Sequence, residues 1–468
     1  PMTVPYDTAG NWILSPNRDQ QIISAVNDRN TVFDETKANR FFGNVFAEIT
    51  LLKGLKFRTM FGLDSRNSVR GQFNGAQSSI RLGSPANATQ TTNNSSSWVY
   101  DNILTYSTRI KSDHSINVTL LQELQSLNRA SSLSMSANNL IFEAQKWYSL
   151  QRNTDATVTG SGSFSATQYM SYMGRVEYGF RNKYLLAISN RYDNSSVLAE
   201  GNKGAWFPAI SVGWQIDNED FMTNIPVISR AKLRAGYGTV GNASIPPYQT
   251  AGPLGFTNYN WGNGVAAIGS APTTFQTPNL SWEKTTTTNI GLEFGLFKNR
   301  ITGVIDLYNS STTDQLQRRS IPSANGVDFV YFNLGEVNNK GIEITMSTMN
   351  VDKKDFKWTT DLNFSTNQIK VTALGPDGSP IIARQATSAS ATTHITQIGA
   401  APGRIRYVDL NNDGVINDLD RDWIGTTLPA LEYGARIDLF YKNFDLQIFG
   451  SGVTGRTGFD AYTSFNNL

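Results

Sequence analysis

Polar and apolar residues alternate along this chain in runs that occur in pairs. In one run, Leu186 and Ile188 alternate with Ala187 and Ser189, and successive side chains of a β-strand point to opposite faces. The pattern therefore predicts antiparallel strand pairs with one apolar and one polar face. The predicted pairs are 41–52 with 55–66, 98–109 with 114–125, 168–180 with 184–195, 204–216 with 231–240, 286–297 with 300–310, 340–350 with 356–368, and 431–441 with 444–453.

Short turns, such as Lys53-Gly54, alternate with long connections between these fourteen predicted strands. Short turns at one end and long loops at the other are typical of an outer-membrane β-barrel, whose strands of roughly 10 residues cross the bilayer at a tilt. A soluble β-sandwich also alternates, but its strands are nearer 5–6 residues. We therefore predict an all-β fold, a transmembrane antiparallel β-barrel, with residues 1–468 as part of a single barrel domain. The predicted long loops are 67–97, 126–167, 241–285, 311–339 and 369–430.

The composition agrees with a barrel and argues against several other classes of protein. The chain has 468 residues, of which 39% are hydrophobic, and a mean hydropathy of −0.32 argues against a bundle of membrane helices. A net charge of +2 is too small to indicate nucleic-acid binding. With no cysteine and only His114 and His394, neither a disulfide framework nor a histidine-based centre is expected, and no nucleophile with a paired base indicates an enzyme. Aromatic residues at predicted strand ends fit interfacial girdles, namely Tyr184, Phe207, Tyr441 and Phe444.

Many short segments, in one order along nearly the whole chain, carry a resemblance to a known family. They are KANRFFGN (37–44), GLKFR (54–58), SYMGRV (171–176), NKYLL (182–186), RYDNSS (191–196), WFP (206–208) with GW (213–214), LRAGYG (233–238) with GN (241–242), WEKT (282–285) with NIG (289–291), NKGIE (339–343) and the stretch 409–425. With these segments the chain resembles the SusC/RagA-type TonB-dependent transporters of Bacteroidota outer membranes.

The resemblance implies a barrel of about 22 strands that encloses a plug domain. The family imports glycans or oligopeptides across the outer membrane, driven by the TonB system, and a SusD-like lipoprotein covers the extracellular mouth. Neither end of the chain looks like a barrel terminus, so we expect an excerpt whose plug and remaining strands lie outside it. Outer-membrane lipid and the lipoprotein are the expected partners.

A calcium-loop pattern occupies residues 409–420. Oxygen ligands would come from the side chains of Asp409, Asn411, Asp413 and Asp420 and from the backbone carbonyl of Val415, with a glycine at the sharp turn. The last ligand is Asp in place of the usual Glu, so a shorter arm must reach the ion. The alternative is an Asp/Asn-rich turn held by its own side chains. A bound Ca2+ would be structural, bracing a long loop.

Aromatic residues also gather in the predicted loop 241–285. Flat aromatic faces beside amide and hydroxyl groups suit sugars or peptide side chains, so this loop is a candidate for substrate binding. Contact with a lid protein and packing within the loop are the alternatives. The candidate substrate-binding residues are Tyr248, Tyr259, Trp261 and Trp282, with Phe256 beside them.

Two further groups of residues are candidates for contacts. For Trp147 and Tyr148 we favour packing within their loop. Arginines on the polar strand faces would contact plug carboxylates or, less favoured, an anionic substrate. These arginines are Arg58, Arg175, Arg191, Arg234 and Arg436.

Two other functions remain open at this stage. The barrel could be a structural docking subunit of a larger outer-membrane assembly. It could also be a self-contained passive channel, which requires that the strands near Phe41 and Val453 pair with each other.

Overall fold

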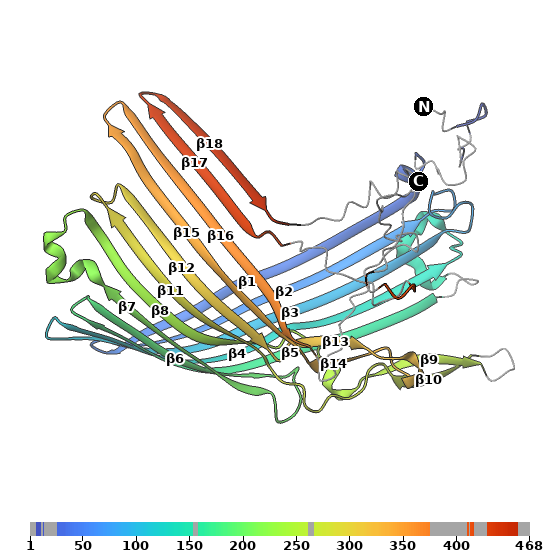
Figure 1. Cartoon of the computed structure of the whole chain (residues 1–468). Coiled ribbons are helices and arrows are strands. Elements are labelled where there is room, and N and C mark those ends of the chain that lie inside the picture. The colour runs from blue at the N-terminus through green and yellow to red at the C-terminus, as the bar shows by residue number, and fades with distance from the viewer. Residues whose placement is uncertain are drawn as a thin grey trace.

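In the computed structural model, all fourteen predicted strands fall in one large antiparallel sheet (Figure 1). The structure describes residues 6–10, 13, 26–152, 158–260, 266–374, 410, 412–415 and 428–456. The predicted all-β antiparallel fold is confirmed. The strands are β1 (Val32–Leu52), β2 (Leu55–Asn74), β3 (Asn87–Ile110), β4 (His114–Asn138), β5 (Val158–Phe180), β6 (Tyr184–Ser195), β7 (Gly204–Gln215), β8 (Ile228–Asn242), β11 (Glu283–Leu296), β12 (Ile301–Thr313), β15 (Glu336–Lys353), β16 (Phe356–Ala373), β17 (Leu431–Tyr441) and β18 (Phe444–Thr454).

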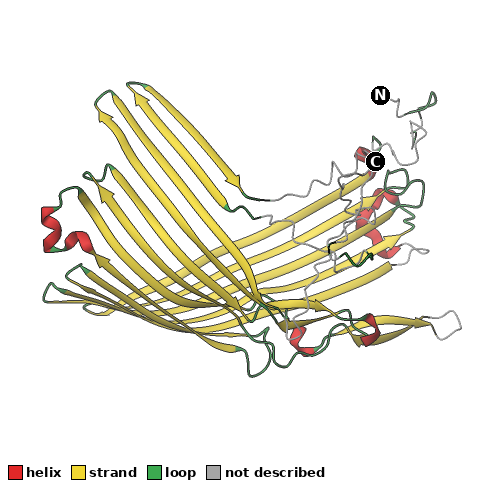
Figure 2. Ribbon diagram, viewed as in Figure 1, coloured by secondary structure: helices red, strands yellow, loops and turns green. Residues whose placement is uncertain are grey.

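The remaining elements are small and lie in the connections (Figure 2). Two hairpins occupy long connections, β9 (Leu254–Asn260) with β10 (Ala266–Pro272), and β13 (Leu316–Ser320) with β14 (Phe329–Asn333). None of the helices in the described ranges is long and apolar enough to span a membrane. The helices are α1 (Asp28–Thr31), η1 (Glu143–Arg152), η2 (Ile216–Asn218), η3 (Asp220–Asn224), η4 (Gln249–Ala251) and η5 (Ser323–Asn325).

Several strands are longer than the alternation predicts. β2 runs on to Asn74 and β3 begins at Asn87, so both enter the predicted loop 67–97. β4 and β5 enter the predicted loop 126–167 in the same way. In these extensions polar residues pair across the strands, with Thr89 and Thr91 hydroxyls 2.9 and 3.0 Å from those of serines on β4. A strand that continues beyond the apolar layer needs no apolar face, so its sequence no longer alternates.

The apolar faces of the strands line up across the sheet. The register places Val176, Ile188, Ile210 and Tyr237 side by side on four successive strands, and each side chain is 44–49% exposed. Such a row of large exposed apolar side chains is unusual for a protein surface in water and is expected of a barrel wall that faces lipid.

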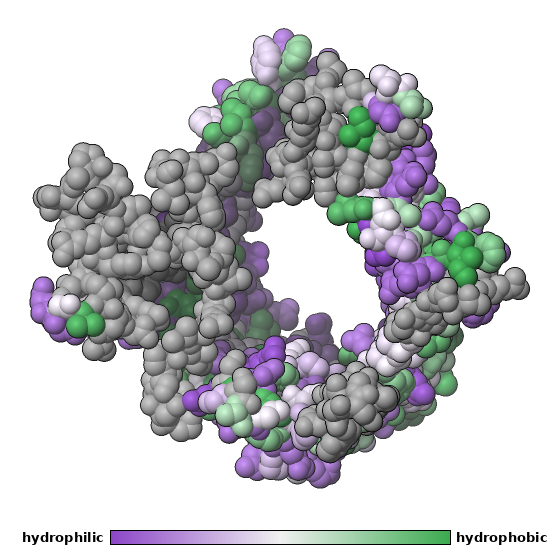
Figure 3. All heavy atoms as spheres, turned by 90° about the vertical axis from the view of Figure 1, so that its right-hand side faces the viewer, coloured by the Kyte–Doolittle hydropathy of each residue, from purple (hydrophilic) through white to green (hydrophobic). Residues whose placement is uncertain are grey.

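The sheet is strongly curved, with its short turns at the left end of Figure 1 and its longer connections at the right. Seen from the right-hand side, hydrophilic residues border much of the described part of a central opening (Figure 3). Within the described residues, β1 pairs only with β2 and β18 only with β17. The pairing between the strands of Phe41 and Val453, which a self-contained fourteen-stranded channel requires, is therefore not found there.

Two packed clusters lie at the end of the long connections. In one, Trp147 of η1 is 5% exposed and packs with Phe73 and Leu140, so the packing predicted for Trp147 is confirmed. The neighbouring Tyr148 is 63% exposed, so the same prediction for Tyr148 was wrong. In the other, Phe207 packs against Trp282 with ring centroids 5.3 Å apart. Placing Phe207 in a lipid-facing girdle was therefore wrong, because the pleat of β7 turns its ring toward the loops that cover the strand end.

Candidate functional site

The polar face of the sheet is lined by ion pairs. Arg191 on β6 donates to Glu123 on β4 at 2.6 Å and to Asp193 at 2.6 Å. Arg234 on β8 donates to the two carboxylate oxygens of Asp306 on β12 at 2.8 and 2.7 Å. The Arg191–Glu123 and Arg234–Asp306 pairs join strands that are not direct neighbours, so they connect the wall across β5 and β11.

A glycine makes the contact between Arg234 and Asp306 possible. Gly291 on β11 is paired with both residues in the register. A Cβ at this position would lie 2.6 Å from the Asp306 carboxylate and 2.7 Å from Arg234 Nε. The guanidinium therefore crosses β11 through the space that the missing side chain leaves.

The barrel wall itself supplies partners for the five arginines singled out in the sequence. Arg175 pairs with Glu177, and Arg436 pairs with Asp438 at 2.9 Å. Arg58 lies over the ring of Phe46, 4.3 Å from its centroid. The proposed contact with a plug domain is untested, but these cations are largely balanced within the sheet. Glu177, Asp193 and Asp438 lie two positions from their arginines on the same strand. The other partners, Glu123, Asp306 and Phe46, lie on other strands and could not be identified without the register.

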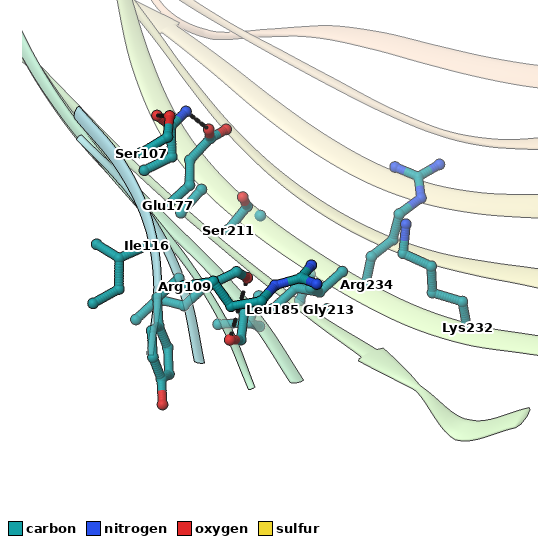
Figure 4. Close-up of a pocket in the computed structure, with 18 of the residues that line it drawn as sticks. Ser107, Arg109, Ile116, Glu177, Leu185, Ser211, Gly213, Lys232 and Arg234 are labelled. Atoms are coloured by element: carbon teal, nitrogen blue, oxygen red, sulfur yellow. Dashed lines mark hydrogen bonds between the residues drawn. The ribbon is translucent and has the colours of Figure 1, made fainter. Parts of the chain in front are cut away.

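A hollow of about 1030 Å³ in the described polar wall lies beside the short turns. Figure 4 shows side chains that line it; the lining residues come from β3 to β8 and, with Asn289, from β11. Leu185 and Ala187 give it apolar surface, while Ser107 and Ser211 give it hydroxyl groups. Arg109, Lys232 and Arg234 add three cationic groups, so the hollow has the mixed lining typical of a binding site.

The aromatic candidates for substrate binding occupy different environments. Tyr248 is half exposed, in a left-handed conformation with φ 68°. Trp282 is 5% exposed, and its indole N–H donates to the carbonyl of Lys203 at 2.8 Å, an arrangement that favours packing for this residue. Tyr259 lies in β9, and Trp261 lies outside the described residues. The structure therefore brings Tyr248 and Trp282 to the same end of the sheet, and of these two residues Tyr248 is the one open to a ligand.

Most of the predicted calcium loop lies outside the described residues, including Asp409, Asn411 and Asp420. Of the predicted ligands, Asp413 and Val415 are described, and the Val415 N–H donates to Asp413 Oδ1 at 2.8 Å. Gly414 has a positive φ of 79°, as the sharp turn of the pattern requires. A bound Ca2+ stays a prediction. Among the described residues, no three His, Asp or Glu side chains form a group that could hold a metal.

A carboxylate brace lies at the opposite end, in the link between β7 and β8. Glu219 accepts hydrogen bonds from Lys183 Nζ at 3.0 Å and from the Trp214 indole at 3.0 Å. Lys183 belongs to the turn before β6, so the brace joins two turns. These donors, with a further hydrogen bond from Tyr184, lower the pKa of Glu219 to about 2.

The brace predicts a stability that depends on pH. Because folding lowers the pKa of Glu219, its ionised carboxylate stabilises the fold at pH values above the ordinary carboxyl pKa of about 4.5. This contribution is lost as the pH falls toward about 2. We expect the melting temperature of the full-length protein to fall over this range, and less steeply in Glu219→Gln. Asp220→Asn is the matched control. Asp220 pairs with the same lysine, but over a longer distance of 3.4 Å and with a fully exposed side chain, so its removal should leave the slope unchanged. An unchanged slope in Glu219→Gln would contradict the assignment.

The chain matches known proteins over nearly its whole length. The profile of the family described as "TonB dependent receptor-like, beta-barrel" covers residues 4–467. TonB-dependent receptor P3 of Formosa agariphila is 30% identical over 456 residues, which are 90% of this chain and 45% of the relative. TonB-dependent receptor SusC of Bacteroides thetaiotaomicron is 29% identical over 480 residues, 93% of this chain and 45% of SusC. The chain thus spans a little under half the length of these relatives.

The fold has a close counterpart among solved structures. The structure of the RagAB peptide transporter superimposes with a TM-score of 0.80 and 20% sequence identity. The match covers 96% of the present chain and 52% of the transporter chain. Identity at this level shows the fold alone. The family profile, the similarity to SusC and this structural match together confirm the predicted resemblance to SusC/RagA-type TonB-dependent barrels.

Proposed function

This chain belongs to the TonB dependent receptor-like β-barrel family, and from that premise we propose that it forms part of the barrel of a SusC/RagA-type importer in the bacterial outer membrane. The observation that carries the proposal is the family match across residues 4–467. The curved sheet supports it, with a row of exposed apolar side chains on one face and hydrophilic residues beside the central opening.

The proposed cargo is a bulky nutrient, a glycan or an oligopeptide. Relatives named SusC and RagAB support this class, and RagAB is described as a peptide transporter. The polar wall supports it too, because a hydrated oligomer passes more easily along hydrogen-bonding groups than along an apolar surface. Import of such a cargo would draw its energy from the TonB system.

The proposed partner is a SusD-like lipoprotein that covers the end with the long connections. The β9–β10 hairpin at that end exposes Phe256 by 90% and Leu254 by 67%. Exposed apolar side chains on a polar loop surface are typical of a contact with another protein.

The proposal is tested by nutrient uptake in the native bacterium. Cells with the full-length gene as the sole transporter of its class should take up a labelled oligomer, and removing TonB should abolish the uptake. A matched strain that lacks the transporter gene gives the background. Uptake that persists without TonB would contradict the proposal and favour a passive channel.

A further inference from the structure

The link between β7 and β8, residues 216–227, turns apolar side chains to the surface and polar side chains toward the barrel. Phe221 and Ile225 are 56% and 41% exposed. Two of the three carboxylates of the link face the barrel instead. The Glu219 side chain is only 12% exposed, and Asp217 accepts from the backbone N–H of Ala231 on β8 at 3.1 Å. A link surrounded by water is expected to do the reverse, with its carboxylates in the solvent and its large apolar side chains packed beneath.

The barrel holds this link in place, so the exposed apolar side chains belong to a defined surface. The Asn218 amide donates to the carbonyl of Asn182 at 3.0 Å, and the side chain of Met222 is buried. In the next short turn, the Phe297 N–H donates to the Val227 carbonyl at 2.7 Å, and both side chains are exposed. The apolar surface therefore extends from the link to this turn. The apolar lip, as we name it, consists of Phe221, Ile225, Val227 and Phe297.

The link packs against the apolar side of the wall. Tyr184 and Trp214 are paired in the register. They share a face with Ile188 and Ile210 of the apolar row, because residues an even number of positions apart on a strand point the same way. Glu219 accepts hydrogen bonds from both aromatic side chains, with the Trp214 indole at 3.0 Å. The link is thus attached on the face that meets lipid, and the lumen lies on the other side of the wall.

Aromatic side chains mark the depth of this attachment. The rings of Phe180 and Tyr184 are stacked with centroids 6.3 Å apart, and His114 lies 5.0 Å from Phe180. Such rings at the strand ends of a membrane barrel are typical of the level of the lipid headgroups. In Figure 2 the helical turns of the link lie at the same end of the sheet as the short turns. The apolar lip therefore lies where headgroups give way to acyl chains.

The sheet continues on both sides of the link. The strands β5, β6, β7, β8, β11 and β12 are successive neighbours. Further strands of the barrel would extend the sheet at β1 or β18, and a plug inside the barrel would cover the polar face. Lipid is therefore the surface that continues from the apolar wall onto the apolar lip.

We propose that the apolar lip is a membrane-binding surface that inserts into the periplasmic leaflet of the outer membrane and contacts phospholipid acyl chains. Amphipathic segments at an interface enter the boundary between headgroups and acyl chains by about 5–10 Å. The inference rests on the membrane location proposed above and is independent of the cargo and of the energy source. A periplasmic protein is the competing occupant.

The experiment places a spin label on the apolar lip. The chain has no cysteine, so Phe221→Cys and Ile225→Cys each give a single labelling site once any cysteine elsewhere in the full-length protein is replaced by serine. The labelled protein is reconstituted in bilayers of phosphatidylethanolamine and phosphatidylglycerol. Electron paramagnetic resonance then compares collisions of the label with oxygen, which concentrates among acyl chains, and with nickel–EDDA, which stays in water. We expect oxygen collisions to dominate at both positions.

Asp220→Cys is the matched control. Asp220 is adjacent to Phe221 and its side chain is fully exposed, so a label there should collide mainly with nickel–EDDA. The proposal is overturned if the labels at Phe221 and Ile225 behave like the label at Asp220. It is also overturned if they are immobilised and reached by neither agent, because a protein would then cover the apolar lip. Two label positions keep the test valid if one substitution disturbs the link.

A label at Ile188→Cys separates the apolar lip from the proposed function. Ile188 lies in the apolar row of the wall, so its label should collide mainly with oxygen. If this label also lies in water, the wall does not face lipid and the proposed barrel fails together with the apolar lip. If the label at Ile188 lies in lipid and those at Phe221 and Ile225 lie in water, only the apolar lip fails.

Discussion

Replacing Ile344 by arginine should destabilise the barrel in lipid by about 2–4 kcal/mol, the cost of a cation on the lipid face near the middle of a bilayer. Ile344 is paired with Ile305 on β12 and Phe364 on β16, so it lies in an apolar row of the outer face. The measurement is the free energy of unfolding of the full-length protein in phosphatidylcholine bilayers, from urea titration.

The next residue provides the control for this prediction. Thr345 points to the opposite face and lines a hollow with Arg230 and Glu293, where an arginine meets water and a carboxylate. Thr345→Arg should therefore change the free energy of unfolding by less than about 1 kcal/mol. Equal losses in the two variants would show that Ile344 does not face lipid.

The strands could be predicted because their signal is local. Each apolar face is set by residues two apart, such as Leu186 and Ile188, and lipid contact demands it of every strand that crosses the membrane. The alternation of apolar and polar residues stops where a strand extends beyond the membrane. Thr89 and Thr91 form regular strand pairs through hydroxyl contacts, yet in sequence they look like a polar loop.

The charged wall could not be predicted because it depends on register across long connections. Arg234 and Asp306 are 72 positions apart and meet only because β8, β11 and β12 are neighbours with Gly291 between them. The sequence identified Arg234 as facing the interior and Gly291 as part of a family segment, but it did not reveal that one makes room for the other.

The role of Trp282 could not be decided from the sequence either. An aromatic residue in a long connection fits a ligand contact and a packing contact equally well. In the structure Trp282 packs with Phe207, Leu198 and Leu280. Gly241 leaves space for the two rings, since a Cβ there would lie 2.2 Å from Phe207 and 2.8 Å from Trp282.

Trp282→Ala should therefore open the packed cluster at this end of the barrel. Truncation of a buried Trp costs about 3–5 kcal/mol, which corresponds to an increase of about a hundredfold or more in the local opening constant. Hydrogen exchange of the full-length protein should speed up by that factor in the segments 197–199 and 243–245, which share the cluster. Because the strands are held by their own ladders, exchange in the middle of β6 should not change.

Two variants determine which property of Trp282 matters. Trp282→Phe keeps a ring against Phe207 but removes one of the two donors to the Lys203 carbonyl. That carbonyl still accepts from the Ser195 N–H at 3.0 Å, so the effect should be smaller, about 0.5–1.5 kcal/mol for one lost hydrogen bond. Tyr248→Ala alters an exposed ring of the same connection and should leave exchange unchanged.

If Trp282→Ala left exchange in both segments at the wild-type rate, the cluster would not depend on Trp282, and ligand contact would again be open for this residue. If exchange rises as expected while Tyr248→Ala alone weakens oligomer binding, packing belongs to Trp282 and ligand contact to Tyr248.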